Sequence, residues 1–259
     1  MFAGKVAVIT GSTSGIGYGI ARVLAGKGCN IMLNGFGQPS EIDKVRNAIS
    51  DLKVKVAYSG ADMSKPNEIR EMIHQAEKDL GKVDILINNA GIQYTAPLEE
   101  FPDEKWAQII SINLSSNFHS VKAVLPGMQS RGWGRIINIA SVHGLVGSVN
   151  KSAYVAAKHG VVGLTKVIAL ENATKGITCN AVCPGWVLTP LVQKQIDDLA
   201  ALKKISEPEA RSELLGAKQP LKDFATPEQI GELVAFLASD NAKSITGASY
   251  TIDGAWTSQ

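Results

Sequence analysis

Short apolar runs alternate with helical stretches along the 259 residues of this chain. Seven runs have the length and composition of buried strands. They occupy residues 5–10, 30–33, 55–59, 83–87, 135–139, 178–182 and 249–252. Helical patterns occupy residues 16–27, 66–80, 103–128, 153–172 and 228–238. This alternation predicts an α/β fold of the Rossmann type, a doubly wound parallel sheet of about seven strands covered by helices on both faces.

One domain, residues 1–259, is the expected organisation, because the chain has no repeat, low-complexity tract or linker rich in Pro, Gly or Ser. The segment 188–226 is the exception, since it is far longer than an ordinary connection of about four to six residues. Apolar residues recur in it at helical spacing: Leu191, Val192, Ile196, Leu199 and Leu202. We therefore expect one or two short helices above the sheet, acting as a lid over a substrate.

The composition excludes several classes of protein. Hydrophobic residues make up 45% of the chain and charged residues 19%, which is enough for a core and too apolar for a disordered chain. The formal charge of +2 indicates neither a nucleic-acid nor a membrane partner. Cys29, Cys179 and Cys183 are an odd number without a disulfide or metal-ligand pattern, so we expect a reducing, cytoplasmic location and no metal.

A glycine-rich segment joins the first expected strand to the first expected helix. Residues 10–17 read TGSTSGIG. Glycines allow a tight turn and a close approach of the backbone to a pyrophosphate, while the helix N-terminus offers free N–H groups. The spacing differs from the usual Gly-x-Gly-x-x-Gly, but its place between strand and helix predicts a dinucleotide site.

The end of the second strand bears on the choice of dinucleotide. An acidic residue there would bind the ribose 2′-hydroxyl group, and a basic one would hold a 2′-phosphate. Residues 34–37 read NGFG and supply neither, and the glycine-rich segment has no Lys or Arg. With no cation for an extra phosphate, NAD is expected rather than NADP. Phe36 is either a packing partner for the adenosine or a core aromatic.

A serine, a tyrosine and a lysine form the candidate catalytic group. Ser141 follows the fifth strand, and Tyr154 and Lys158 begin the next helix four residues apart, on one face. A phenol has a pKa of about 10, too high for acid–base work at neutral pH. A nearby ammonium favours the phenolate, so we expect Lys158 to lower the pKa of Tyr154. The hydroxyl group of Ser141 would then bind the reacting oxygen.

Taken together, these motifs resemble the short-chain dehydrogenase/reductase family over essentially the whole chain. The matching elements are TGxxxGxG at 10–17, NNAG at 88–91, Asn113, Ser141, YxxxK at 154–158 and PG at 184–185. The resemblance implies a single Rossmann-type domain, hydride transfer with a nicotinamide cofactor, and a homotetramer.

The resemblance also implies roles for individual residues. Tyr154 would be the general acid/base, Lys158 would also bind the nicotinamide ribose, and Asn113 would take part in a proton relay. Asp62 would contact the adenine, Asn89 the adenosine ribose region and Thr189 the nicotinamide carboxamide. The expected cofactor-binding residues are Gly11, Thr13, Ser14, Gly15, Ile16, Gly17, Phe36, Asp62, Asn89, Gly91, Tyr154, Lys158, Pro184, Gly185, Val187 and Thr189.

A second set of segments is similar to the bacterial branch of that family that interconverts D-3-hydroxybutyrate and acetoacetate. These segments are NGFG at 34–37, IQ at 92–93, SVHGLV at 141–146, NKSAY at 150–154, GW at 185–186, QKQ at 193–195 and DGAW at 253–256. The likeness implies a small 3-hydroxy acid or 3-keto acid as substrate. The substrate-binding residues would be Gln93, Ser141, His143, Lys151, Tyr154, Trp186, Gln195 and Trp256.

This assignment agrees with the chemistry, because Lys151 supplies charge for a carboxylate and two tryptophans can wall a small, water-poor pocket. Each residue considered alone also has a structural interpretation. Lys151 would be a solvated lysine, His143 a structural residue, and the tryptophans packing or interface residues. Another reductase of the family, such as a 3-oxoacyl-carrier-protein reductase or a sugar or alcohol dehydrogenase, is the main alternative. A nucleotide-binding regulator without catalysis is disfavoured by the intact Ser141, Tyr154 and Lys158.

Overall fold

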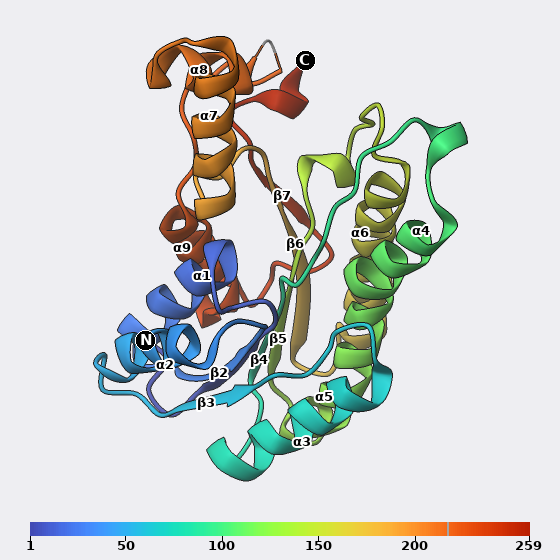
Figure 1. The fold of residues 1–259 in the computed structure, drawn as a ribbon. Coiled ribbons are helices and arrows are strands. Elements are labelled where there is room, and N and C mark those ends of the chain that lie inside the picture. The colour runs from blue at the N-terminus through green and yellow to red at the C-terminus, as the bar shows by residue number, and fades with distance from the viewer. Residues whose placement is uncertain (217) are drawn as a thin grey trace.

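The computed structural model describes residues 1–216 and 218–259. In this part of the chain all seven apolar runs form strands of one parallel sheet, as predicted (Figure 1). The strands are β1 (Val6–Ile9), β2 (Asn30–Asn34), β3 (Val56–Ser59), β4 (Ile85–Asn88), β5 (Gly134–Ile139), β6 (Ile177–Pro184) and β7 (Ser249–Ile252). Their order is β3-β2-β1-β4-β5-β6-β7, so the doubly wound topology is confirmed.

Helices cover both faces of the sheet. They are α1 (Gly15–Gly26), α2 (Pro39–Ser50), α3 (Pro66–Leu80), α4 (Asp103–Ile110), α5 (Ser116–Arg131), α6 (Ser152–Asn172), α7 (Pro190–Lys203), α8 (Glu207–Leu215) and α9 (Pro227–Ala238). Figure 1 shows α1, α2 and α9 on one side of the sheet, and α3, α4, α5 and α6 on the other. A separate apolar cluster fills the space on each side, and the inward residues of the strands divide between the two clusters.

Two helical predictions differ from the structure. The predicted helix over 103–128 is interrupted at Ser111–Ser115, which forms a π-helical turn between α4 and α5. We assigned no residue range to a helix between β2 and β3, where α2 lies. Within α2 only Ile49 is fully buried, so the helix carries too little apolar signal to stand out in the sequence.

The segment 188–226 forms α7 and α8, in agreement with the expected helices above the sheet. Figure 1 shows them standing beyond one end of the strands, next to the C-terminus of the chain. They pack on an apolar cluster of their own, built around the buried Val192, Ile196 and Leu215 and the incoming Phe224. We call α7, α8 and this cluster the lid.

The topology places a crevice at the carboxyl end of β1 and β4. The strand order reverses there, since β1 pairs with β2 on one side and β4 on the other, and the loops that leave the two strands diverge. Helix α6 borders the same end of the sheet. By length and composition alone α6 could span a membrane, but it packs on the sheet and begins with the candidate catalytic residues.

Candidate active site

Two asparagines tie the loops around the glycine-rich segment together. Asn89, which follows β4, donates from Nδ2 to the carbonyl oxygens of Thr10 and Gly11, at 2.9 Å each. Gly11 has a φ of 62°, and a Cβ atom there would lie 2.9 Å from Cα of Ala90. Asn34 accepts the Gly11 N–H at 3.2 Å. The turn therefore requires glycine and is held on both sides.

The N-terminus of α1 is open to a ligand. Ser14 is the N-cap residue, yet its side chain makes no capping hydrogen bond, and no acidic residue lies in the first turn. The first N–H groups of a helix need partners from outside it, and they carry the positive end of the helix dipole. The geometry fits a phosphate group at this position.

A cavity of about 440 Å³ begins at this helix N-terminus and runs along the switch point. Ten of the predicted cofactor-binding residues line it: Gly11, Thr13, Ser14, Gly15, Ile16, Phe36, Asp62, Asn89, Gly91 and Thr189. The structure does not bring the other six to its lining: Gly17, Tyr154, Lys158, Pro184, Gly185 and Val187. Gly17 instead packs beneath it, where a Cβ atom would collide with the carbonyl oxygen of Gly11.

Three residues of the lining have clear local roles. Phe36 is 68% exposed, so the core-aromatic interpretation is wrong and its ring is free to cover a ligand. Asp62 accepts hydrogen bonds from the backbone and hydroxyl group of Ser64, both at 2.8 Å, and these bonds lower its pKa. Thr189 caps α7 by accepting the N–H of Val192 at 3.3 Å. Through Thr189 the lid reaches the cavity.

The candidate catalytic residues gather at the carboxyl end of β5. Lys158 is almost fully buried, and its Nζ donates to the carbonyl oxygen of Ile139 at 2.7 Å. The same Nζ lies 5.6 Å from the centroid of the Tyr154 ring. Ser141 caps a short 3₁₀ turn, where its Oγ accepts the N–H of His143 at 3.1 Å. The serine, tyrosine and lysine therefore converge, as the sequence predicted.

The expected lowering of the tyrosine pKa is not found. Burial raises the pKa of Tyr154 above its ordinary value, and hydrogen bonding with Ser141 offsets only part of the rise. Burial also lowers the pKa of Lys158 to about 8. The physical reason is that both side chains lie in the same water-poor wall, where desolvation disfavours either charged form. The ammonium donates to a carbonyl oxygen rather than to the phenol.

Asn113 occupies the π-helical turn. It is buried, and its side chain makes two hydrogen bonds to the backbone of Ile92, with Oδ1 accepting at 2.9 Å and Nδ2 donating at 2.8 Å. These bonds join the loop after β4 to the helix that packs on α6. Such π turns often occur at functional sites. The proton-relay role of Asn113 stays a prediction.

Aromatic rings connect the catalytic tyrosine to the C-terminal segment. The ring of His143 meets the ring of Tyr154 edge to face, with 6.2 Å between centroids. It meets Trp256 in the same way at 5.4 Å. The structure thus brings three of the predicted substrate-binding residues together, from the 3₁₀ turn after β5, from α6 and from the end of the chain.

His143 is uncharged near neutral pH. Burial, followed by the charges of Lys151 and Lys218, lowers its pKa to about 4. Its Nδ1 is buried without a hydrogen-bond partner in the part of the chain that the structure describes. Buried polar atoms are nearly always hydrogen-bonded, so this unpaired nitrogen beside the catalytic group marks His143 as a candidate functional residue.

The remaining predicted substrate residues stand apart from this cluster. Trp186 is half-buried and packs on Phe224 of the lid, with 6.5 Å between ring centroids, so its observed role is to support the lid. Gln93 and Gln195 are exposed, and their roles stay predictions. Lys151 is half-buried at the start of α6, three residues before Tyr154.

Sequence reasoning missed a buried polar chain behind the site. Asn88 donates to Asn138 at 2.8 Å, Asn138 donates to Thr165 at 2.8 Å, and Ser120 donates to Asn88 at 2.7 Å. This chain locks the carboxyl ends of β4 and β5 to α5 and α6. Asn88 is part of the recognised NNAG motif, but nothing in the spacing of the other residues indicates the contact.

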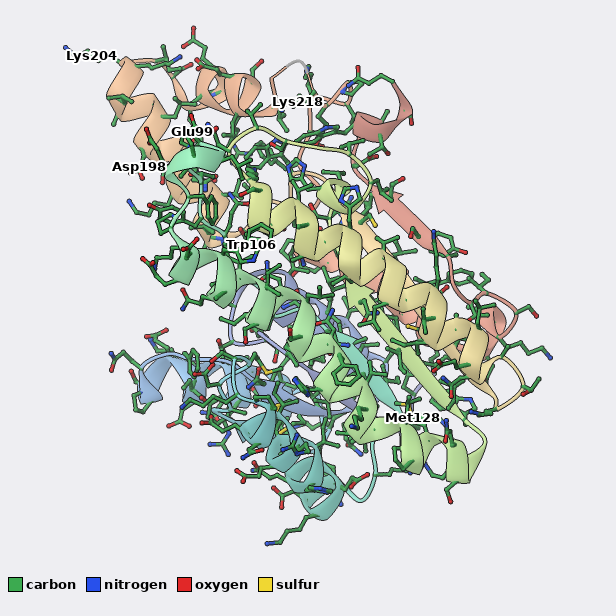
Figure 2. All side chains as sticks on the ribbon, turned by 90° about the vertical axis from the view of Figure 1, so that its right-hand side faces the viewer. Glu99, Trp106, Met128, Asp198, Lys204 and Lys218 are labelled. Atoms are coloured by element: carbon green, nitrogen blue, oxygen red, sulfur yellow. The ribbon has the colours of Figure 1, made fainter. Side chains whose placement is uncertain are left out.

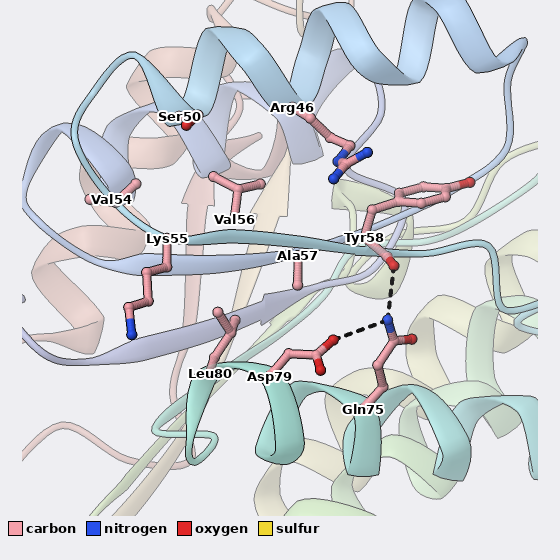
Figure 3. A pocket seen from close by; sticks show the side chains of 10 residues that line it. All are labelled: Arg46, Ser50, Val54, Lys55, Val56, Ala57, Tyr58, Gln75, Asp79 and Leu80. Carbon is pink, nitrogen blue, oxygen red and sulfur yellow. Dashed lines mark hydrogen bonds between the residues drawn. The ribbon is translucent and has the colours of Figure 1, made fainter.

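A second, larger cavity of about 550 Å³ lies beside the edge strand β3, between α2 and α3 (Figure 3). There Gln75 donates to the carbonyl oxygen of Tyr58 and to Asp79. The residues of the serine–tyrosine–lysine group do not line this cavity. They do not line the smaller cavity either, but ten predicted cofactor-binding residues do, and its lining residue Ile92 is bonded to Asn113 in the π-helical turn that packs on α6. The candidate active site is therefore the smaller cavity together with the catalytic cluster.

Comparison with known proteins agrees with this geometry. A family model described as short chain dehydrogenase matches residues 5–200 of the chain. The chain belongs to this family. The short-chain dehydrogenase is therefore an oxidoreductase, and membership of the family implies a nicotinamide cofactor for the cavity at α1.

Individual relatives are similar over their full lengths. The D-beta-hydroxybutyrate dehydrogenase of Cupriavidus necator is 54% identical over 259 residues, covering 100% of both chains. That of Rhizobium meliloti is 53% identical over 98% of this chain and 99% of its own. Among solved structures, levodione reductase matches with a TM-score of 0.90 at 32% identity, covering 100% of this chain and 99% of the other.

Proposed function

We propose that this short-chain dehydrogenase interconverts D-3-hydroxybutyrate and acetoacetate with NAD as the cofactor. The proposal depends most on one observation: the ring of His143 meets the ring of Tyr154, its Nδ1 has no hydrogen-bond partner among the described residues, and the charge of Lys151 acts on it. A small 3-hydroxy acid needs a hydrogen-bonding group at its alcohol and a cation a few ångströms away for its carboxylate. The names of the two relatives that are more than half identical support the same substrate.

Each residue of the cluster has a place in this reaction. When bound, NAD supplies the nicotinamide carbon that accepts a hydride from C3 of the alcohol. Tyr154 takes the proton from the alcohol oxygen during oxidation and returns it to the ketone oxygen during reduction. Ser141 donates a hydrogen bond to the same oxygen. Lys158 supplies charge and hydrogen bonds beside the phenol.

The preference for NAD follows from the cavity lining. None of the described residues that line the cavity is Lys or Arg, and its one charged side chain is the carboxylate of Asp62. Lys44 lines the adjoining cavity on the other side of Thr13, but it is paired with Glu41 at 2.7 Å. A 2′-phosphate at this site would therefore lack a cation.

The decisive experiment compares two cofactors and three substrates by initial rates. With NAD, we expect D-3-hydroxybutyrate to be oxidised with a catalytic efficiency at least about a hundredfold above that of the L-enantiomer or of neutral 2-butanol, a gap of about 2.7 kcal/mol. NADP should be much the poorer cofactor. A preference for NADPH with a 3-oxoacyl thioester would instead identify a carrier-protein reductase.

The lid is proposed to close over this site. It rests on its own apolar cluster rather than on the core of the sheet, and it reaches the cofactor cavity through Thr189. Closure would exclude water during hydride transfer and bring Gln195 toward the carboxylate. Amide hydrogen exchange should slow over residues 188–218 when both ligands are added. Protection that is already high and does not change would contradict closure.

A homotetramer is proposed as the assembly. Large apolar side chains remain exposed on the outer face of α4, α5 and α6: Trp106, Phe118, Val167 and Leu170. Figure 2 shows this face toward the viewer, with Trp106 labelled on α4. Leu170 alone is 80% exposed. Several large exposed apolar side chains on one face are typical of an interface between subunits. Native mass spectrometry of the purified protein tests the assembly.

A further inference from the structure

Lys218 lies on the connection between α8 and α9, above the C-terminal segment. Its Nζ is 5.8 Å from the centroid of the Trp256 ring. Its carbonyl oxygen accepts a hydrogen bond from Gln259 at 3.0 Å. Both the backbone and the side chain of this lysine therefore contact the end of the chain that covers the catalytic cluster.

Three rings link this ammonium to the reacting centre. Trp256 meets His143, and His143 meets Tyr154, each pair edge to face. Lys218 lies at the outer end of this series and Tyr154 at the inner end. The lysine is exposed, so its ammonium is free to move along the tryptophan toward a ligand.

The charges around the cluster are unbalanced. Lys218 acts on both His143 and Lys151, and its charge contributes to lowering the pKa of each. Within residues 1–216 and 218–259, no carboxylate lies within 4.0 Å of the ammonium of Lys151 or Lys218. Two like charges that both act on His143, without a counter-ion, favour the binding of an anion near that ring.

We propose that Lys218 is a second carboxylate-binding residue, so that the substrate carboxylate lies between the ammonium groups of Lys218 and Lys151. The inference rests on the proposed 3-hydroxy acid activity and deepens it. Lys151 begins α6 beside the sheet, whereas Lys218 follows the lid. A bound carboxylate is then the counter-ion that joins the two sides of the site, and a neutral alcohol cannot take that place.

The test uses two variants of Lys218 and one control. Lys218→Met removes the charge, Lys218→Arg keeps it, and Lys204→Met removes a charge from the far side of the lid (Figure 2). Each variant is assayed with D-3-hydroxybutyrate and with its neutral methyl ester. The ester keeps the alcohol and the carbon chain but lacks the negative charge.

For Lys218→Met we expect KM for the acid to rise about tenfold, the lower end for losing a hydrogen bond to a charged group, while kcat stays within about twofold. Lys218→Arg should retain most of the affinity. Catalytic efficiency with the ester should not change, and Lys204→Met should match the parent. An unchanged KM for the acid would overturn the proposal. An equal loss with acid and ester would also overturn it, since Lys218 would then only support Trp256.

A binding measurement separates this inference from the proposed function. Butyrate carries the carboxylate but cannot react, and its binding can be followed through tryptophan fluorescence in the presence of NAD. We expect Lys218→Met to weaken butyrate binding about tenfold, whichever alcohol the enzyme oxidises. If the parent fails to oxidise 3-hydroxybutyrate but this loss remains, only the proposed function is wrong. If butyrate binds parent and variant equally, the role of Lys218 is wrong.

Discussion

The cofactor side and the lid side of this enzyme are built from different interactions. Around the cofactor cavity, Asn34 and Asn89 bond directly to the backbone of the glycine-rich turn, which sits on the buried ends of the strands. The lid has a small apolar cluster and exposed ion pairs, such as Lys194 with Asp198 at 3.1 Å. Regions with few buried contacts open at lower free energy than the core. The comparison predicts a preformed cofactor site beneath a part that opens independently of the sheet.

The largest effect is expected from Tyr154→Phe, which separates cofactor binding from chemistry. The variant loses only a hydroxyl group, and that group alone is proposed to move the alcohol proton. General acid–base catalysis contributes about 10²–10⁴-fold, so kcat should fall by that factor. The dissociation constant for NAD, measured by fluorescence titration, should stay within about twofold, because the cradle is untouched. Activity within tenfold of the parent would rule out the assigned role.

A matched pair of isoleucines tests the two regions directly. Ile20 of α1 and Ile196 of α7 are both fully buried, one in the main core and one in the lid cluster. Ile20→Ala should lower the free energy of unfolding by about 2–5 kcal/mol, the usual cost of such a cavity. Ile196→Ala should greatly reduce the fraction of molecules in which the lid is closed. It should change the free energy of global unfolding by less than about 1 kcal/mol.

Urea unfolding measures the stability of the two isoleucine variants, and steady-state kinetics measures their KM for the hydroxy acid. Ile20→Ala should shift the unfolding midpoint and leave KM for the hydroxy acid nearly unchanged at low temperature. Ile196→Ala should change KM for the hydroxy acid and leave the unfolding midpoint nearly unchanged. Equal destabilisation by the two substitutions would mean that the lid and the sheet unfold as one unit.

Replacing Lys158 tests how much the buried charge of this catalytic residue lowers the stability of the folded protein. Its pKa is about 8 in the folded protein, below the ordinary 10.5, because burial disfavours the charge. The unfolded chain therefore binds more protons between pH 8 and 10.5, and the stability of the parent rises with pH across that window. At pH 7 the free energy of unfolding of Lys158→Met should exceed that of the parent by about 1–3 kcal/mol, although the variant loses the hydrogen bond to Ile139.

The pH series decides whether that gain comes from the buried charge. The advantage of Lys158→Met should shrink as pH rises from 8 toward 10.5 and should be absent above that window, when the lysine is neutral in both states. Activity should be lost at every pH. A constant difference in stability across the series would show that packing, not charge, distinguishes the two proteins.

The sequence predicts the sheet well because buried parallel strands leave a direct mark on composition. Each strand is an apolar run, and the switch point follows from the order of the elements. The position of helix α2 was not predicted, because Ile49 is its only fully buried residue. The π turn at Ser111–Ser115 escaped because it depends on the bond between Asn113 and the distant backbone of Ile92. Local patterns do not contain such a contact.

The candidate site also has some features that the sequence predicts and others that it does not. The glycine-rich turn and the Tyr154–Lys158 spacing are short motifs, so sequence reasoning found them. The pKa of Tyr154 depends on desolvation, which only the folded wall around it determines, and the expected direction was wrong. Lys218 is a single lysine on a connection, and its significance comes from the C-terminal ring of Trp256, 5.8 Å away in space.

The smallest effect is expected from Arg211, which braces α8 against α7. Its Nε donates to Glu207 at 3.0 Å, its Nη2 donates to Gln193 at 2.9 Å, and its guanidinium lies over the ring of Phe224. Exposed interactions of this kind contribute about 0.2–1 kcal/mol, too little to detect in global unfolding. Arg211→Met keeps the aliphatic packing but removes the charge, so amide exchange should quicken about two- to fivefold within α7 and α8 only. Exchange in β1 and α1 should match the parent, since those elements do not open with the lid. Faster exchange spread over the sheet would show that the lid is part of the core, and the distinction between the two sides would fail.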